Sequence, residues 1–284
     1  MSSTSKGNER LLFDGQSLNG WRSIPRIYGD LYPGGPTVPA WLAEARGFTP
    51  PADAAEHPAH WFVEDGCIIG EQNPPGSGYG GYLITEDTFG DFELSFEARP
   101  DFPADTGIMI RRQGERWEGF QVLLDHRDFG GIGGFFGNGL ASFAAVPFAI
   151  RGQRDADGVV VGLEADDPAT SLEPVTEEKI RQLSHAAEVE DFLRIWKWND
   201  WNRFRIRCVG SLPVITTWIN DLKVAEVDTA TISWPNYDPK AIHELLGDRG
   251  HIALEVHDND PYYGENRWGR GAQCRWRDLR VVEL

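Results

Sequence analysis

Stretches in which apolar and polar residues alternate recur along most of the chain, and they constrain its fold more than any other feature. In residues 92–99, Phe92, Leu94 and Phe96 alternate with acidic or small polar residues. A period of two places these two sets on opposite faces of a β-strand. Similar stretches, separated by glycine, proline and aspartate, lie at residues 61–70, 81–85, 107–112, 120–125, 204–209, 214–220, 251–257 and 274–283. Many short strands of this kind indicate an all-β sandwich or barrel.

The apolar phase of these strands also predicts the core. Residues of one phase share a face, so they pack together where two sheets close on each other. At 284 residues and without an internal repeat, the chain is expected to form a single β-sandwich domain over residues 1–284. The side chains expected in its core are Phe92, Leu94, Phe96, Ile108, Ile110, Val122, Ile252, Leu254 and Val256.

Two segments interrupt the strand pattern and are predicted to be insertions that border a cleft. Residues 24–60 hold seven of the 18 prolines and show little periodicity, which predicts an ordered surface loop or lid. Residues 151–200 form the second insertion. A plain sandwich needs neither segment, and loops commonly carry specificity.

One or two short helices are expected outside the strands. The first follows Pro174, with Thr176 as its N-cap, and its apolar stripe is formed by Ile180, Leu183 and Ala187. The second covers residues 238–246, where Asp238 is the N-cap, Pro239 is the first helical residue and Gly247 ends the helix.

Charge and composition narrow the class of ligand. The net charge of −17 opposes a phosphate backbone and an anionic membrane surface, so neither nucleic acid nor a membrane is an expected partner. No apolar run is long enough to span a bilayer. The three cysteines, Cys67, Cys208 and Cys274, lack metal-ligand spacing and are predicted to be small buried hydrophobes. A neutral small-molecule ligand fits this composition best.

The first ten residues are polar and contain no apolar stretch of the kind found in secretory signals. As written, the chain is therefore expected in the cytoplasm. A leader removed before this point would instead make it periplasmic or secreted. The sequence gives no prediction of the oligomeric state.

A polar face on the strand at 251–257 marks the candidate site. Ala253, Glu255 and His257 share one face, opposite the apolar residues of the same strand. Four more polar residues fall in similar strands and in the same phase: Glu97, Arg111, Gln121 and Asp125. This arrangement predicts a binding cleft built across a sheet.

Two other motifs have the residue types of a binding site. Residues 130–139 contain six glycines, but the order Gly-x-Gly-x-x-Gly is missing and no helix follows, so a twisted hairpin or a loop is favoured over a phosphate cradle. Asp258 and Asp260, together with Glu265, could ligate calcium through oxygen. Their spacing does not match an EF-hand, so a solvated loop is favoured and no metal or other cofactor is expected.

Glu93 and Glu97 offer a third possibility, because sandwich glycosidases of the laminarinase type carry three acids at alternate positions of one strand. The middle position here is Ser95. Residues i and i+4 of a strand lie roughly 13 Å apart, whereas retaining hydrolysis needs two carboxyls about 5–5.5 Å apart. A retaining glycosidase using Glu93 and Glu97 is therefore the weakest alternative, and surface ion pairs explain Glu93 as well.

Tryptophans outside the predicted core point to a sugar ligand. Aromatic faces pack against the C–H faces of sugar rings, and several tryptophans lie in predicted loops or at strand ends. Core packing is the competing explanation, and the sequence does not decide between the two. The tryptophans concerned are Trp117, Trp196, Trp198, Trp201 and Trp268.

Taken in order, several segments resemble the 3-keto-disaccharide hydrolase family. They are residues 12–21 (LFDGQSLNGW), 61–66 with Ile68 and Gly70, 81–85, 89–94, 106–111, 119–122, 250–255 with His257, and 277–281. The resemblance covers most of the chain outside the two insertions. It implies a two-sheet antiparallel jelly-roll sandwich of the concanavalin A-like lectin and glucanase type.

The sequence departs from this family at three positions of the predicted cleft. Family members often carry Glu at position 121, Gln at position 123 and Gln at position 255, where this chain has Gln121, Leu123 and Glu255. The carboxylates are thus redistributed across the cleft, which leaves the identity of the base open.

The resemblance implies cleavage or hydration of glycosides whose C3 hydroxyl is already a ketone. The ketone acidifies the C2 hydrogen, so a base can form an enolate that expels the C1 substituent, after which water adds. This chemistry needs a base, an enolate-stabilising donor and an acid. No redox cofactor is implied, because a separate dehydrogenase makes the ketone. The competing hypothesis is a non-catalytic carbohydrate-binding sandwich module.

Roles follow from the resemblance for each candidate. His257 is the expected base, and Glu255 orients it or substitutes for it. Arg111 stabilises the oxyanion and Asp125 is the acid, unless those two only form an ion pair beside the sheet. The residues expected to bind substrate are Gln121, Glu97, His126, Trp117 and Trp201, of which His126 is also a reserve base.

Overall fold

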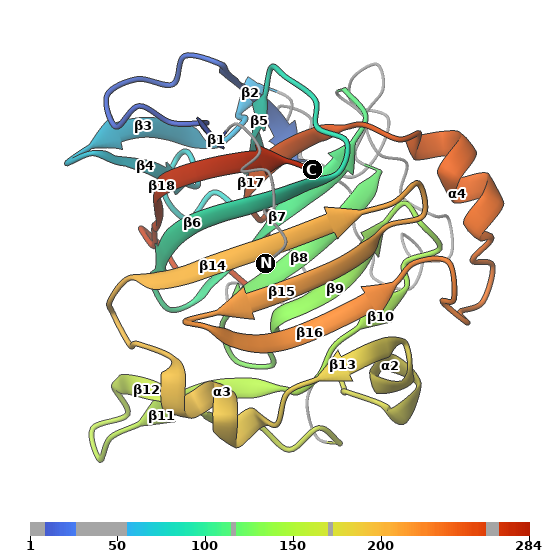
Figure 1. Cartoon of the computed structure of the whole chain (residues 1–284). Helices are drawn as coiled ribbons and strands as arrows, with labels where there is room; N and C mark the ends of the chain where they lie inside the picture. Colours follow the sequence, from blue (N-terminus) through green and yellow to red (C-terminus); the bar gives the residue numbers. More distant parts are fainter. Residues whose placement is uncertain (1–8, 27–55, 115–117, 170–172, 260–266) are drawn as a thin grey trace, which may run out of the picture.

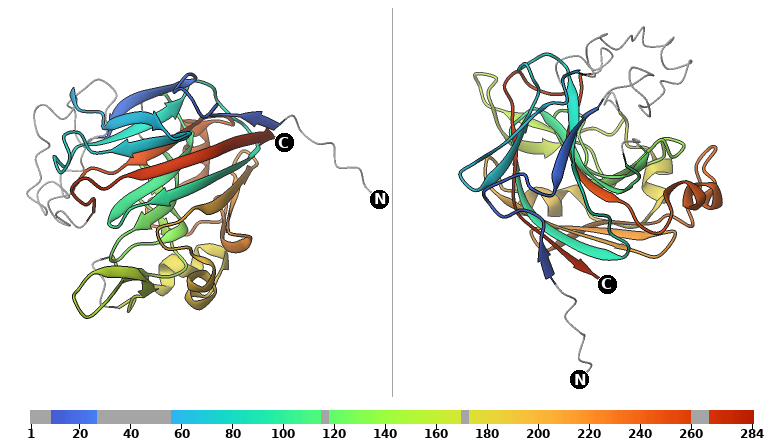
Figure 2. Two further views of the ribbon diagram at one scale, coloured as in Figure 1. Left: turned by 90° about the vertical axis from the view of Figure 1, so that its left-hand side faces the viewer. Right: turned by 90° about the horizontal axis from the view of Figure 1, so that it is seen from above.

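The computed structural model describes residues 9–26, 56–114, 118–169, 173–259 and 267–284. Its strand pairs are all antiparallel and form two large sheets and one separate hairpin. The two large sheets lie one behind the other (Figure 1), and views at right angles show the same two layers (Figure 2). The predicted all-β sandwich with two antiparallel sheets of the jelly-roll type is confirmed.

The front layer of Figure 1 is a nine-stranded sheet. It contains β1 (Glu9–Leu11), β3 (His60–Glu64), β4 (Cys67–Glu71), β6 (Phe92–Pro100), β13 (Leu183–Ala186), β14 (Asn202–Val209), β15 (Val214–Ile219), β16 (Leu222–Asp228) and β18 (Cys274–Glu283). Their order is β13-β16-β15-β14-β6-β18-β4-β3, and β1 pairs with β18. β3 and β4 are joined by Asp65 and Gly66, both with positive φ, which is typical of a two-residue hairpin turn.

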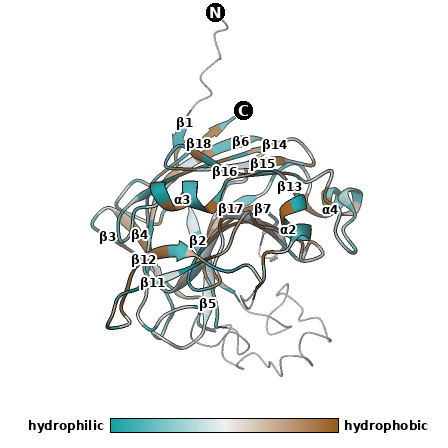
Figure 3. Cartoon of the chain, turned by 90° about the horizontal axis from the view of Figure 1, so that it is seen from below, coloured by the Kyte–Doolittle hydropathy of each residue, from teal (hydrophilic) through white to brown (hydrophobic). Residues whose placement is uncertain are grey.

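The second layer is a seven-stranded sheet that carries the candidate site. It contains β2 (Trp21–Arg26), β5 (Gly80–Thr85), β7 (Ala104–Arg112), β8 (Gly119–His126), β9 (Ile132–Asn138), β10 (Ala144–Ala145) and β17 (His251–Val256). Their order is β10-β9-β8-β7-β17-β5-β2. In the view from below, β17 and β7 lie beneath the row formed by β18, β6, β14, β15 and β16, so the two sheets are seen one above the other (Figure 3).

The main core fills the space between these sheets. Its buried side chains come from both layers, for example Phe96 and Ile206 from the nine-stranded sheet and Val122 and Leu254 from the other. Alternation explains this, because each strand turns its apolar phase toward the facing sheet. All nine predicted core residues are buried in this cluster, so that prediction is confirmed. The three cysteines are also buried and unpaired.

The second insertion contains more regular structure than predicted. Helix α2 (Glu177–Arg181) begins as expected, since the Thr176 hydroxyl accepts a hydrogen bond from the Lys179 amide at 3.3 Å. The predicted stripe to Leu183 and Ala187 is wrong, because the chain leaves the helix to form β13, which pairs with β16 and becomes the edge strand of the nine-stranded sheet. Earlier in the insertion, β11 (Ile150–Arg154) and β12 (Val160–Ala165) form a hairpin.

The described residues contain two further helices. Helix α3 (Val189–Ile195) was not predicted, and it buries Phe192. Helix α4 (Pro239–Leu246) was predicted, and its N-cap Asp238 accepts from the Lys240 amide at 3.0 Å. None of the helices in the described ranges is long and apolar enough to cross a membrane.

The structure also revises the start of the first insertion. Residues 24–26 belong to β2, so the regular sheet continues to Arg26 rather than stopping before Ile24. Most of the predicted insertion, residues 27–55, lies outside the described residues. The glycine-rich segment contributes β9, which pairs with β8 as one arm of a hairpin.

Candidate functional site

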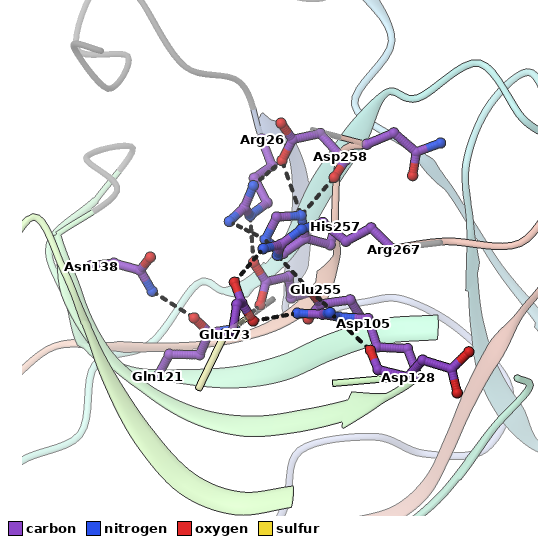
Figure 4. Close-up of polar contacts among 12 residues, drawn as sticks. Arg26, Asp105, Gln121, Asp128, Asn138, Glu173, Glu255, His257, Asp258 and Arg267 are labelled. Carbon is purple, nitrogen blue, oxygen red and sulfur yellow. Dashed lines mark hydrogen bonds and ion pairs between the residues drawn. The ribbon is translucent and has the colours of Figure 1, made fainter. Parts of the chain in front are cut away.

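The outer face of the seven-stranded sheet carries a buried polar cluster beside a small apolar floor. The floor consists of Ile24, Tyr82, Ile84, Met109 and Ala253, which form a buried cluster separate from the main core. Figure 4 shows polar side chains from several strands gathered on one side of the curved sheet. We call the following set the polar cluster: Arg26, Asp105, Gln121, Asp125, Arg127, Asn138, Glu173, Glu255, His257, Asp258 and Arg267.

Glu255 lies in the middle of this cluster and is fully buried. One carboxylate oxygen accepts a hydrogen bond from Arg26 Nε, and the other accepts from the amide of Gln121. Thr106 Oγ1 donates to the backbone carbonyl of Glu255 and so fixes the strand at this point. Burial raises the pKa of Glu255, although the charge of Arg26 opposes that shift. Glu255 is therefore a stronger proton acceptor when ionised than an exposed glutamate.

His257 is held as a neutral imidazole between two guanidinium groups. Its Nε2 lies 2.7 Å from Arg26 Nη2 and 2.6 Å from Arg267 Nη1, and both arginines can only donate, so Nε2 accepts. The proton then sits on Nδ1, which is 2.6 Å from the backbone carbonyl of Asp258. Burial, together with the charges of Arg26, Arg267 and Arg127, holds the pKa of His257 well below its ordinary value of 6.5.

Asp105 and Asp125 face each other from neighbouring strands. They are directly opposite in the antiparallel pairing of β7 and β8, so both carboxyls point out from the same face. Asp105 accepts from Arg127 Nε at 3.0 Å and also from Arg267 Nη1. Burial and the nearby charge of Asp105 raise the pKa of Asp125 well above its ordinary value of 3.8.

Glu173 brings the second insertion to the polar cluster. Its carboxylate accepts from Arg127 Nη2 at 2.7 Å and from Arg267 Nη2 at 3.2 Å. It is thus a second counter-ion for the two arginines that bind Asp105. This contact brings one residue of the second insertion to the polar cluster.

A glycine keeps the middle of the floor open for Gln121. Gly107 lies between Asp105 and Met109 on β7, and a Cβ at this position would be 2.7 Å from Gln121 Nε2. Without that Cβ, Gln121 crosses the strand to reach Glu255. Its carbonyl oxygen accepts from Asn138 Nδ2 at 2.9 Å, which fixes the amide orientation.

The prediction that Arg111 joins this site is wrong. Ala253 pairs with Met109 but His251 pairs with Arg112, so β7 has one extra residue and Arg111 adopts a φ of 56°. Such a bulge reverses the alternation. Arg112 therefore shares the outer face and lies over the Tyr82 ring at 4.0 Å, whereas Arg111 binds Asp91 and the Gly210 carbonyl, each at 3.1 Å.

His126 also lies apart from the polar cluster. It follows Asp125 directly in β8, so its side chain leaves the opposite face of the sheet. Its ring packs beside Phe102, Trp196 and Trp198, and its Nδ1 is 2.9 Å from the Asp101 carbonyl. Burial lowers the pKa of His126 to about 4. This environment is an aromatic cluster rather than a polar cleft.

Glu97 lies on the other sheet, and Trp201 directly precedes β14 of that sheet. Glu97 on β6 forms an ion pair with Arg277 at 2.7 Å, and the Trp201 ring stacks on the guanidinium of the same arginine at 4.0 Å. Glu93, four residues before Glu97, pairs with Arg205. Neither acid contacts the polar cluster. Trp117 lies outside the described residues.

The structure thus unites four of the predicted residues, Gln121, Asp125, Glu255 and His257. It adds several that sequence reasoning missed. Asp105 had a detectable signal, because it shares the phase of Gly107 and precedes the segment assigned as a strand. Arg26 was hidden in the presumed insertion, and Arg267 follows no periodic pattern. Glu173 precedes α2 and has no local signature.

The proposed calcium ligands have other contacts or are not described. Asp258 forms a buried ion pair with Arg26, while Asp260 and Glu265 lie outside the described residues. Within the described part of the chain, no group of three or more His, Cys, Asp or Glu side chains is arranged to hold a metal ion.

Comparisons with known proteins complete the description of the site. A family model for the 3-keto-alpha-glucoside-1,2-lyase-like domain matches residues 8–282, which confirms the resemblance drawn from the sequence motifs. No match was found among curated proteins.

Several solved structures are similar in fold. A candidate glycosyl hydrolase from Parabacteroides distasonis ATCC 8503 is 12% identical, with a TM-score of 0.49 and coverage of 99% of this chain and 95% of its own. A beta-1,3-glucanase from Mycobacterium marinum is 12% identical, with a TM-score of 0.44 and coverage of 99% and 100%. A carbohydrate-binding module from Bacillus subtilis is 10% identical, with a TM-score of 0.41 and coverage of 79% and 92%. Similarities at this level say nothing about the chemistry of this chain.

Proposed function

The chain belongs to the 3-keto-alpha-glucoside-1,2-lyase-like family, and from that premise we propose that it cleaves 3-keto-glycosides by elimination and then adds water. The observation that carries the proposal is one buried site that combines a carboxylate of raised pKa, a second carboxyl that favours its protonated form, and two guanidinium groups that meet at His257. Base, acid and oxyanion stabiliser are the three groups that this chemistry requires.

The proposed reaction has three steps. The base takes the C2 hydrogen as a proton, and the C–H electron pair forms a C2–C3 double bond with the negative charge on the C3 oxygen. This enolate collapses to restore the ketone, a C1–C2 double bond forms, and the bond from C1 to the leaving oxygen breaks. The leaving oxygen takes a proton from the acid. Water then adds its oxygen to C1 and gives one proton to the acid, while the protonated base returns its proton to C2.

We assign the base role to Glu255 rather than His257. The single lone pair of His257 Nε2 already accepts hydrogen bonds from two arginines, and its lowered pKa makes it a weak base. Among the described side chains, each oxygen of Glu255 accepts one hydrogen bond, and a carboxylate offers about four lone-pair sites. Glu255 can therefore receive a proton while Arg26 and Gln121 stay in place.

The enolate oxygen needs a cation, and Arg26 and Arg267 are the proposed donors. Both guanidinium groups donate to His257 Nε2, so the neutral imidazole is a shared acceptor that holds them in position. A planar guanidinium presents several N–H donors to one oxygen anion. This assignment replaces Arg111, whose side chain is bound at the far end of β7.

Asp125 is the proposed acid for the leaving oxygen. It lies on β8 and Glu255 lies on β17, and both strands flank β7. Two strand spacings, about 10 Å, therefore separate their backbones, which leaves room for a sugar ring between the side chains. The raised pKa of Asp125 favours the protonated form that an acid needs.

The test compares matched substrates. Purified protein is incubated with the 3-keto and the unoxidised form of one aryl glucoside, and aglycone release is followed. Release from the 3-keto form alone is the expected result. Release from the unoxidised form would instead support a retaining glycosidase, and binding without release from either form would support a carbohydrate-binding module.

A further inference from the structure

The two facing carboxyls of the polar cluster have unequal environments. Asp105 accepts hydrogen bonds from two guanidinium groups, those of Arg127 and Arg267. In the described part of the chain, Asp125 Oδ1 is buried and has no hydrogen-bond partner. The two arginines therefore bind one member of the pair, although both carboxyls lie on the same face of neighbouring strands.

We propose that Asp105 is a positioning residue that makes Asp125 a proton donor: the pair shares one proton, the two arginines keep Asp105 ionised, and the proton stays on Asp125. This inference rests on the proposed function and deepens it. Two facing carboxylates cannot easily both ionise in a buried site. The member that lacks guanidinium contacts is the one that takes the proton.

The charged groups around the pair support this assignment. Arg127 follows β8, Arg267 precedes β18, and Glu173 comes from the second insertion. Glu173 accepts hydrogen bonds from Nη2 of both arginines. Its negative charge offsets part of their positive charge, so the arginines stabilise an ionised Asp125 less. Burial and the charge of Asp105 together favour the protonated form of Asp125.

Infrared spectroscopy tests the proton location without any substrate. A protonated carboxyl has a C=O stretching band that an ionised carboxylate lacks. We expect this band at neutral pH in the wild-type protein and its loss in Asp125→Asn. We also expect its loss in Asp105→Asn, because the two arginines then turn to Asp125 and ionise it, and its retention in Asp105→Glu. A wild-type spectrum without the band, or a band that survives Asp105→Asn, would overturn the proposal.

Unfolding in urea gives a second test for the case that Asp105→Asn folds poorly. Asp125→Asn removes the cost of holding a proton on Asp125 in the folded state, so its urea midpoint at neutral pH should equal or exceed that of the wild type. Asp105→Asn removes one of the two carboxylates that Arg127 and Arg267 bind in the folded protein and should lower the midpoint clearly. Equal losses in both variants would contradict the unequal charge assigned to the pair.

Leaving-group dependence links the pair to the reaction. Asp105→Asn should slow release of an alkyl alcohol from a 3-keto-glucoside by roughly 10²-fold, yet barely slow release of a nitrophenolate, which needs no proton. Equal slowing of both substrates would contradict a role in protonation. If the infrared results hold but no 3-keto-glucoside is cleaved, the carboxyl pair stands and the proposed function fails.

Discussion

Both sheets carry arginine and acid side chains on their outer faces. These side chains are partly exposed on the nine-stranded sheet and buried on the seven-stranded sheet. On the nine-stranded sheet, Glu97 and Arg277 pair at 2.7 Å with side-chain exposures of 28% and 38%. On the seven-stranded sheet, Arg26 and Glu255 pair with exposures of 4% and 0%. Exposed pairs contribute about 0–1 kcal/mol, whereas breaking a buried pair costs about 3–5 kcal/mol.

This difference teaches that the residue types alone do not make a site. In water, a carboxylate beside an arginine is screened and behaves as an ordinary surface group. In the polar cluster, burial raises the pKa of Glu255 and of Asp125 and lowers the pKa of His257. Desolvation therefore turns a common surface pattern into a set of groups suited to acid and base chemistry.

The sharpest test of this comparison is to neutralise one acid on each face. Glu255→Gln removes the proposed base, and we expect cleavage of a 3-keto-glucoside to fall by roughly 10²–10⁴-fold. Glu97→Gln removes an exposed acid of the same type and should leave the rate unchanged. Steady-state kinetics on both variants measure the difference, and a similar loss in both would remove the distinction between the faces.

Breaking one ion pair on each face compares their stabilities. Arg26→Met strands the buried carboxylates of Glu255 and Asp258, so the free energy of unfolding should fall by about 3–5 kcal/mol. Arg277→Met breaks an exposed pair and should cost about 1 kcal/mol or less. Urea titrations give both values. If Arg26→Met proved the milder change, the buried network would not be held together by charge.

A smaller perturbation tests the geometry of the floor. In Gly107→Ala, the new Cβ approaches Gln121 Nε2 to 2.7 Å, so Gln121 must move and Glu255 loses its orienting amide. We expect kcat to fall by about tenfold to 10²-fold, because small misplacements of reacting groups are costly. Gly162→Ala, in the hairpin of the second insertion, is the matched control and should leave kcat unchanged. Unaltered kinetics in Gly107→Ala would show that Gln121 does not position the base.

The weakest expected effect is a pH dependence with opposite signs for two residues. The folded-state pKa of His257 lies below 6.5, so its contribution to stability is lost as the pH falls from about 6.5. The folded-state pKa of Asp125 lies above 3.8, so its contribution is present below that value and is lost as the pH rises through the folded-state pKa.

Each group changes the slope of stability against pH by up to about 1.4 kcal/mol per pH unit. The measurement compares urea unfolding of the wild type with that of His257→Gln and of Asp125→Asn. The pH is varied from about 4 to about 8 in steps of about one unit. His60→Gln, at an exposed pair of the nine-stranded sheet, controls for a histidine change outside the cluster. Slopes of the same sign for the two cluster variants would contradict the assigned protonation states.

The fold was largely predictable because alternation is a local signal. Strands such as β6 and β17 show it without interruption, and the residues of their predicted apolar faces all lie in the main core. Helix α4 was predictable from Asp238, Pro239 and Gly247, whose roles depend only on neighbouring residues. The short helix α3 has no side-chain cap, so the sequence offered no comparable start signal.

The site was only partly predictable, because phase alone says neither which sheet a strand joins nor where a bulge lies. Glu97 has the right phase but belongs to the nine-stranded sheet. Arg111 has the right phase by count, yet the extra residue in β7 exchanges it with Arg112. Arg267 and Glu173 reach the cluster from irregular segments, where only the folded chain reveals their neighbours.

The central claim is that the buried face removes the C2 proton of a 3-keto-glycoside. The direct measurement is turnover of a 3-keto-glucoside deuterated at C2, compared with the undeuterated substrate, for the wild type and for Glu255→Gln. We predict a primary isotope effect on aglycone release by the wild type and almost no release by Glu255→Gln. The claim is contradicted if the wild type releases aglycone with neither an isotope effect nor exchange of the C2 hydrogen with solvent, and if Glu255→Gln releases it at an undiminished rate.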